Sequence, residues 1–133
     1  CTSDTFISAD TSEVRWLIPG KDTELMDDYL RPRGFAWLEE DWVDALKAGY
    51  SYCAVIKDNK IVSTAAVWKY SEGAWEVAAV HTLDEYQRRG LGAKVVSFVA
   101  QYILENHKIA TCTTRADNMA MRKTAESVGF YLV

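Results

Sequence analysis

The chain has 133 residues, a formal net charge of −4, and 49% hydrophobic and 26% charged residues. This length indicates a single domain, residues 1–133, and the composition is typical of a globular protein with a sizeable core. Lys and Arg are scattered rather than gathered in a basic stripe, so we expect no nucleic-acid partner. Apolar runs stay shorter than the roughly 18 residues that a membrane helix needs, so we expect no membrane contact.

Three cysteines, Cys1, Cys53 and Cys112, are widely spaced along the chain. Their odd number and spacing fit neither a disulfide framework nor a zinc site, so we expect no bound metal. Cys53 and Cys112 lie in apolar, strand-like runs typical of reduced core residues, which favours a cytoplasmic protein. No secretory signal is apparent, and the chain opens at Cys1 rather than Met, so we expect that the natural start is missing or processed.

The first part of the chain predicts one weak strand, two amphipathic helices and a three-stranded meander. The strands are expected at 6–18, 50–56, 61–70 and 75–83, and the helices at 22–30 and 38–46. Asp58 and Asn59 predict a two-residue hairpin turn, because both tolerate positive φ. Regular alternation along the third meander strand predicts Glu76 and Val80 on one face and His81 on the other.

The second part of the chain changes character. A loop at 84–92 leads into an amphipathic helix at 93–106, followed by a strand at 109–114, a helix at 118–128 and the start of a strand at 130–133. A strand, a crossover helix and a following strand favour parallel pairing. The fold class is therefore α/β with a mixed, mostly antiparallel sheet that becomes parallel toward its end and carries helices on both faces.

The loop before the long helix has the sequence Gln87-Arg88-Arg89-Gly90-Leu91-Gly92-Ala93. Glycines let successive backbone N–H groups point inward, and the helix start adds unpaired N–H groups and partial positive charge. Such a loop suits a pyrophosphate, although a simple tight turn remains an alternative. It is neither a P-loop, because no Gly-Lys-Ser/Thr follows, nor a dinucleotide fingerprint, because Val95 replaces the third glycine.

This loop resembles the acyl-CoA pyrophosphate motif of the GNAT superfamily, Gln/Arg-x-x-Gly-x-Gly/Ala. A second segment resembles the family's Asn-x-x-Ala-x-x-Leu-Tyr-Glu-x-x-Gly-Phe helix through Asn118, Met121, Ala125, Glu126, Gly129 and Phe130. The element order between residues 50 and 130 also matches. The resemblance implies the acyl-CoA N-acyltransferase fold and transfer of an acetyl group from acetyl-CoA to a primary amine of a small molecule or peptide.

The resemblance also implies site residues. The pyrophosphate would be held by Gln87, Arg88, Arg89, Gly90, Leu91, Gly92 and Ala93. The pantetheine arm would pair with the strand end at Val80, His81 and Thr82, as an added strand does. The Val80 amide is the candidate for polarising the thioester carbonyl. Asn118 either contacts the cofactor or only caps its helix.

The acceptor amine must lose a proton first, because an alkylammonium has a pKa of about 10.4. Glu76 is the candidate base, since it precedes Gln87 by the spacing of the general-base glutamate in the histone-acetylating branch; a solvent-facing carboxylate is the alternative. The family's tyrosine acid is replaced by Ala125, so Tyr86 or a water is the candidate acid. Cys112 has no activating base near it in sequence. We read His81 as a packing residue or a partner for a backbone group, and a catalytic part is the alternative.

The first two helices would wall the acceptor pocket, as they do in this fold. Aromatic candidates there are Tyr29, Phe35, Trp37 and Trp42, and the acidic residues that would suit a cationic amine are Asp27, Asp28, Glu39, Glu40 and Asp41.

We also expect an open sheet edge near the end of the chain. The family adds a hairpin after its Gly-Phe pair, which we expect to be truncated here, and an open sheet edge favours a homodimer. Two alternatives remain: a non-catalytic acyl-CoA-binding module, and a structural or interaction domain that uses only the fold.

Overall fold

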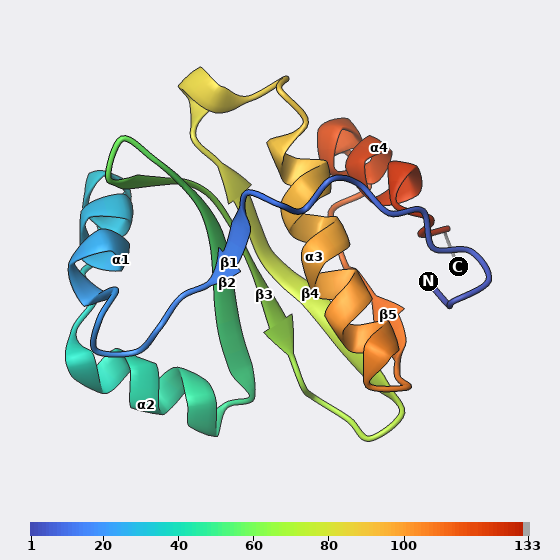
Figure 1. The fold of residues 1–133 in the computed structure, drawn as a ribbon, viewed down its shortest axis with the longest axis horizontal. Helices are drawn as coiled ribbons and strands as arrows, with labels where there is room; N and C mark the ends of the chain where they lie inside the picture. Colours follow the sequence, from blue (N-terminus) through green and yellow to red (C-terminus); the bar gives the residue numbers. More distant parts are fainter. Residues whose placement is uncertain (132–133) are drawn as a thin grey trace.

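A single five-stranded sheet forms the centre of the protein in the computed structural model, which describes residues 1–131 (Figure 1). The strand order is β1-β2-β3-β4-β5, and all neighbours are antiparallel except the parallel pair β4 and β5. The bounds are β1 (Val14–Trp16), β2 (Tyr50–Lys57), β3 (Lys60–Trp68), β4 (Ala74–Thr82) and β5 (Ile109–Thr111). The predicted mixed sheet is confirmed.

Helices cover both faces of this sheet. On one face lie α1 (Thr23–Leu30) and α2 (Glu39–Lys47), and on the other α3 (Leu91–Glu105) with α4 (Met119–Ser127) beside it (Figure 1). Short 3₁₀ turns, η1 (Arg31–Arg33) and η2 (Asp84–Tyr86), follow α1 and β4. Val95, Val99 and Ile103 of α3 are fully buried in the larger core, whereas Trp42 anchors a smaller core under α1 and α2.

Several element bounds differ from the sequence prediction. β1 is much shorter than 6–18, because the residues before it run along the helices: the Ile7 amide donates to the Val128 carbonyl at 2.9 Å, and the Ala9 amide to Ser97 Oγ at 3.0 Å. α3 begins at Leu91, directly after the left-handed Gly90, and β5 ends at Thr111. Of the predicted last strand, 130–131 is not in a strand and 132–133 lies outside the described residues.

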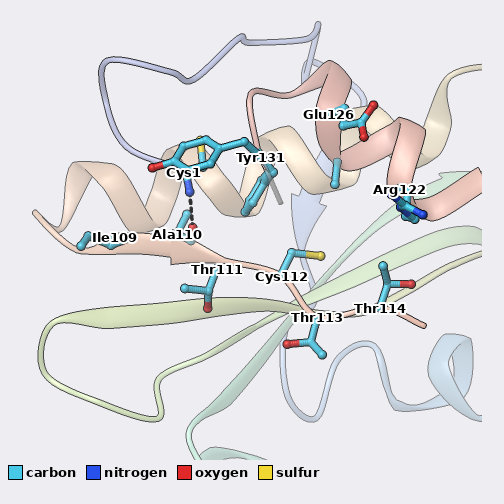
Figure 2. A pocket seen from close by; sticks show the side chains of 12 residues that line it. Cys1, Ile109, Ala110, Thr111, Cys112, Thr113, Thr114, Arg122, Glu126 and Tyr131 are labelled. Atoms are coloured by element: carbon cyan, nitrogen blue, oxygen red, sulfur yellow. Dashed lines mark hydrogen bonds between the residues drawn. The ribbon is translucent and has the colours of Figure 1, made fainter. Parts of the chain in front are cut away.

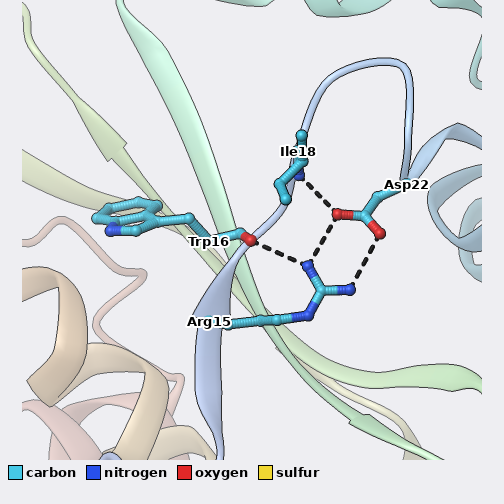
Figure 3. A network of polar contacts seen from close by, with 4 residues as sticks. All are labelled: Arg15, Trp16, Ile18 and Asp22. Atoms are coloured by element: carbon cyan, nitrogen blue, oxygen red, sulfur yellow. Dashed lines mark hydrogen bonds and ion pairs between the residues drawn. The ribbon is translucent and has the colours of Figure 1, made fainter.

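An ion pair between the exposed Arg15 and the buried Asp22 joins β1 to the start of α1 (Figure 3). Arg15 donates to both carboxylate oxygens of Asp22, at 2.8 and 3.0 Å, and the Ile18 amide donates to one of them at 2.6 Å. The Asp22 side chain is only 3% exposed. These bonds fix the chain segment that leads into the α1 face of the sheet.

A β-bulge interrupts β4 at Ala79, which has a φ of 52°. The pairing shifts there, because Ala78 lies opposite Ala66 whereas His81 lies opposite Thr64. An extra residue reverses the alternation of side chains beyond it. Val77 and Val80, three positions apart, therefore both pack into the α3 core.

The bulge overturns the predicted faces of β4. Glu76 and His81 lie on the α1 face, and Val80 and Thr82 lie on the α3 face. The sequence prediction, which assumed regular alternation, had Glu76 and Val80 on one face of the strand and His81 on the other.

The two parallel strands stay paired over a short distance only. Their register runs from Ala74 opposite Ile109 to Glu76 opposite Thr111. Beyond Glu76, the edge of β4 has no β5 partner in the described part of the chain. Backbone groups at this edge are available to another extended chain.

Candidate functional site

A groove of about 540 Å³ lies at the open end of β4, and we term it the loop groove. It is lined by Val80, His81, Thr82, Tyr86, Gln87, Arg88, Gly90, Leu91, Gly92, Ala93, Asn118, Ala120, Met121 and Thr124. All residues predicted to bind the cofactor are therefore brought together, with the exception of Arg89. The Arg89 guanidinium instead lies 5.1 Å from the centre of the Tyr86 ring.

The backbone of the loop before α3 supplies donors to this groove. Arg88 and Gly90 have positive φ, at 64° and 77°, and α3 starts immediately afterwards. Within residues 1–131, no hydrogen bond is made by the backbone N–H groups from Arg88 to Ala93. The Gln87 side chain ties the loop to β4 by donating to the Thr82 carbonyl at 3.2 Å. A run of free N–H groups at a helix start is an anion site.

The far wall of the loop groove comes from α4. Asn118 caps this helix, since its Oδ1 accepts a hydrogen bond from the Met121 amide at 3.1 Å, and it also lines the groove. Ala120, Met121 and Thr124 were not predicted as wall residues. The spacing of Asn118, Met121 and Thr124, three apart on a helix, is the signal that places them on one face.

A second cavity, of about 250 Å³, opens on the opposite face of β4, and we term it the α1 cavity. Its lining residues are Met26, Tyr29, Leu30, Arg33, Trp37, Tyr52, Thr64, Ala79, Val80 and His81. Val80 and His81 line both the α1 cavity and the loop groove. The two spaces therefore meet at these adjacent residues, just after the bulge.

Only some of the residues predicted for the acceptor wall line the α1 cavity. Tyr29 and Trp37 line the α1 cavity, whereas Phe35 is exposed and Trp42 is a core residue. None of the predicted acidic residues lines it. Asp27, for example, accepts hydrogen bonds from Arg31 at 2.6 Å and from the Trp37 amide at 2.9 Å. The charged residue of the cavity wall is instead Arg33.

Tyr29 and His81 form a polar pair inside the α1 cavity. The Tyr29 hydroxyl is hydrogen-bonded to Nδ1 of His81 and also donates to the His81 carbonyl at 3.3 Å. Burial lowers the pKa of His81, and the nearby Arg33 charge lowers it further, whereas Asp84 raises it. Burial raises the pKa of Tyr29, so this hydroxyl stays protonated.

Glu76 lies away from both spaces. Its Oε1 accepts a hydrogen bond from Thr113 at 2.9 Å, and it lines neither the loop groove nor the α1 cavity. Glu76 was chosen as the candidate base for its spacing from Gln87. That spacing does not show the bulge at Ala79, which changes how Glu76 lies relative to Val80. The role of Glu76 as the base therefore stays a prediction.

A third cavity, of about 460 Å³, lies along the outer edge of β5, and we term it the edge cavity (Figure 2). Figure 2 shows Cys112 in its wall, together with the Cys1 amino group donating to the Ala110 carbonyl at 2.7 Å. Burial raises the pKa of the Cys112 thiol to about 11, and the Glu76 charge adds to this. Such a thiol is protonated at neutral pH and is a poor nucleophile.

Residues 1–131 contain no group of three His, Cys, Asp or Glu side chains arranged for a metal ion. In the same range, no helix has the length and apolar character needed to cross a membrane.

Comparison with solved structures identifies the fold. A GNAT-family protein from Novosphingobium aromaticivorans superposes with a TM-score of 0.72 at 22% identity, over 93% of this chain and 53% of that protein. This chain thus spans about half the length of that protein. The aminoglycoside N-acetyltransferase AAC(6′)-Iy, solved in complex with CoA, gives 0.70 at 16% identity over 90% of this chain and 91% of its own.

A ribosomal-protein-alanine N-acetyltransferase from Brucella melitensis also gives a TM-score of 0.70, at 12% identity over 90% of this chain and 92% of its own. The architecture is therefore the acyl-CoA N-acyltransferase fold. The family model of the acetyltransferase (GNAT) family matches residues 16–130, and the chain belongs to this family of acyltransferases. No curated protein sequence matches it significantly.

Proposed function

We propose that the protein is an N-acetyltransferase that transfers the acetyl group of acetyl-CoA to a primary amine of a small molecule or peptide. The observation that carries the proposal is the run of free backbone N–H groups from Arg88 to Ala93, which lines a groove beside the open edge of β4. In this proposal the loop holds the pyrophosphate, and the pantetheine arm follows the β4 edge toward Val80.

The proposed chemistry is direct attack. The neutral amine enters from the α1 cavity and forms a bond to the thioester carbonyl carbon. The Val80 amide stabilises the negative charge that develops on the carbonyl oxygen. The carbon–sulfur bond then breaks, and the CoA thiolate takes a proton from Tyr86, which lines the loop groove, or from a water. A thiol with a pKa of about 8.5 is a good leaving group, so this acid can be weak.

Several finer points belong to the same proposal. The donor is acetyl-CoA, no metal takes part, and the protein is cytoplasmic. Both N-acetyltransferases described above are named for amine acceptors, a drug and a protein alanine, which supports an amine here. The similarity to them is in the fold, so the identity of the acceptor rests on experiment.

The test is isothermal titration of the protein with acetyl-CoA, alongside a Gly92→Glu variant. A Cβ at Gly92 would meet Thr124 at 3.6 Å, which is ordinary contact, and Gly92 lines the loop groove. We expect the variant to weaken binding at least tenfold, because it brings a negative charge to the anion site. The control is Gly73→Glu, at a position with no atom within 4 Å of an added Cβ.

Release of CoA thiol from a panel of amines then separates the hypotheses. Binding with amine-dependent thiol release supports the acetyltransferase. Binding without release favours the non-catalytic acyl-CoA-binding module, and a folded protein that binds no acetyl-CoA favours the structural or interaction domain.

A further inference from the structure

We propose that His81 is the general base that takes the proton from the acceptor ammonium, and that Tyr29 is the residue that positions it. This inference rests on the proposed acetyltransferase function and deepens it.

The position of His81 is the first argument. His81 and Val80 are the residues common to the α1 cavity and the loop groove. An amine held in the α1 cavity and a thioester held near the Val80 amide would meet beside the imidazole. A general base must lie within hydrogen-bond reach of the proton it removes, directly or through one water, and this position satisfies that requirement.

The hydrogen bonds of Tyr29 select the form of the imidazole. A hydroxyl donates one proton, and we assign that of Tyr29 to the His81 carbonyl, 3.3 Å away. In this arrangement the Tyr29 oxygen accepts from Nδ1–H of His81. In a neutral imidazole with its proton on Nδ1, Nε2 carries the free lone pair, as a base requires.

Nε2 is also reachable. In residues 1–131, Trp37 Nε1 is the one side-chain nitrogen or oxygen that is fully buried and lacks a hydrogen-bond partner. His81 Nε2 has no hydrogen-bond partner in the same part of the chain and is not among the fully buried atoms, so it keeps some exposed surface.

The charged and titratable groups around His81 favour a neutral ring. Tyr29 faces it from α1, Arg33 from η1 and Asp84 from η2. Burial and Arg33 outweigh Asp84, so the pKa of His81 lies below its ordinary value. The positive charge of Arg33 also disfavours an ammonium ion in the same cavity, which helps the acceptor to lose its proton.

The proton balance is complete. The acceptor ammonium gives one proton to Nε2, and the free amine forms the new carbon–nitrogen bond. The thiolate takes a proton from Tyr86 or a water as the tetrahedral intermediate collapses, and the second proton of the amine replaces that proton through solvent. His81 returns its proton to solvent, so the net products are the amide, CoA and one proton.

The kinetic test compares His81→Gln with the parent in CoA-release assays. We expect kcat/KM at pH 7 to fall by about 10²–10⁴, the range for loss of a general base, with acetyl-CoA affinity retained. The deficit narrows at high pH, where the amine deprotonates unaided. In the parent, ionisation of His81 gives the pH profile of kcat/KM an inflection on its acid side, below the ordinary histidine pKa of about 6.5. We expect His81→Gln to lack this inflection. Glu72→Gln, at an exposed position between β3 and β4, is the control for a substitution to glutamine outside both spaces.

Glu76→Gln is the competing variant. A large loss there, together with near-parental activity of His81→Gln, overturns the inference and leaves the acetyltransferase function standing. A parent that binds acetyl-CoA but acetylates no amine overturns both.

A measurement without turnover tests the same idea. Nitrogen NMR of the His81 ring at pH 7 should show the neutral form with its proton on Nδ1, and Tyr29→Phe should change this tautomer balance. An imidazolium at pH 7, or a proton fixed on Nε2, contradicts the inference.

Discussion

Ala79 has a left-handed backbone conformation that alanine adopts at a cost of about 1–2 kcal/mol. This strain persists because the β3–β4 ladder continues on both sides of the bulge and because the Thr64 hydroxyl donates to the Ala79 carbonyl at 3.3 Å. Strained backbone of this kind is concentrated at functional sites. Here it places His81 on the same face of β4 as Glu76, and Val80 on the same face as Val77.

The Arg15–Asp22 ion pair gives a prediction at the same scale. We expect Asp22→Asn to lower the free energy of unfolding by about 1–3 kcal/mol, because the buried bonds from Arg15 and Ile18 lose their charged acceptor. Urea unfolding at neutral pH measures this, with the exposed Asp28→Asn as the control. A variant as stable as the control would contradict it.

The same hydrogen bonds make the effect of Asp22→Asn on the free energy of unfolding depend on pH. Hydrogen bonds from Arg15 hold the pKa of Asp22 below its ordinary value in the folded state. The stabilisation is therefore present above the unfolded pKa of about 3.9 and is lost as pH falls through the folded pKa. The stability difference between parent and Asp22→Asn should shrink in that acidic range.

At the scale of elements, η1 controls the electrostatics of the α1 cavity through Arg33. We expect Arg33→Gln to raise the pKa of His81, because it removes a positive charge that disfavours the imidazolium. Titration of the His81 ring by NMR measures the shift, and Lys47→Gln, which lines neither the α1 cavity nor the loop groove, is the control. A pKa that stays unchanged in Arg33→Gln would contradict this prediction.

The geometry of the loop before α3 was predictable because it depends on local sequence. Gly90 and Gly92 beside a helix start indicate a turn with free backbone N–H groups, and the loop groove gathers those residues. The same holds for Asn118 as a helix cap. Arg89 was the exception, since its packing on Tyr86 is a contact that spacing does not encode.

The faces of β4 were not predictable. Alternation assumes an unbroken ladder, and no glycine or proline in the strand signals the bulge at Ala79. Its position follows from how β3 and β4 pair in the folded sheet. The Tyr29–His81 pair was missed for the same reason, because it joins residues 52 positions apart in the chain.

At the scale of the whole molecule, the outer edge of β5 bears on assembly. Cys1 pairs with Ala110 by bonds of 2.7 and 3.0 Å and covers one point of this edge. The edge cavity continues past it along Cys112 and Thr113 (Figure 2). We expect a homodimer, because an open strand edge favours pairing with a second chain. Sedimentation velocity tests this, and a monomer at micromolar concentration would contradict it.

Among residues 1–131, the loop groove and the α1 cavity share only Val80 and His81 as lining residues. One wall is built from the β4–α3 loop and α4, and the other from α1, η1 and the middle of the sheet. In the proposed acetyltransferase, the acyl donor occupies the loop groove and the acceptor amine occupies the α1 cavity. Substitutions in the α1 cavity would then change the preference for amines while the binding of the donor stays the same.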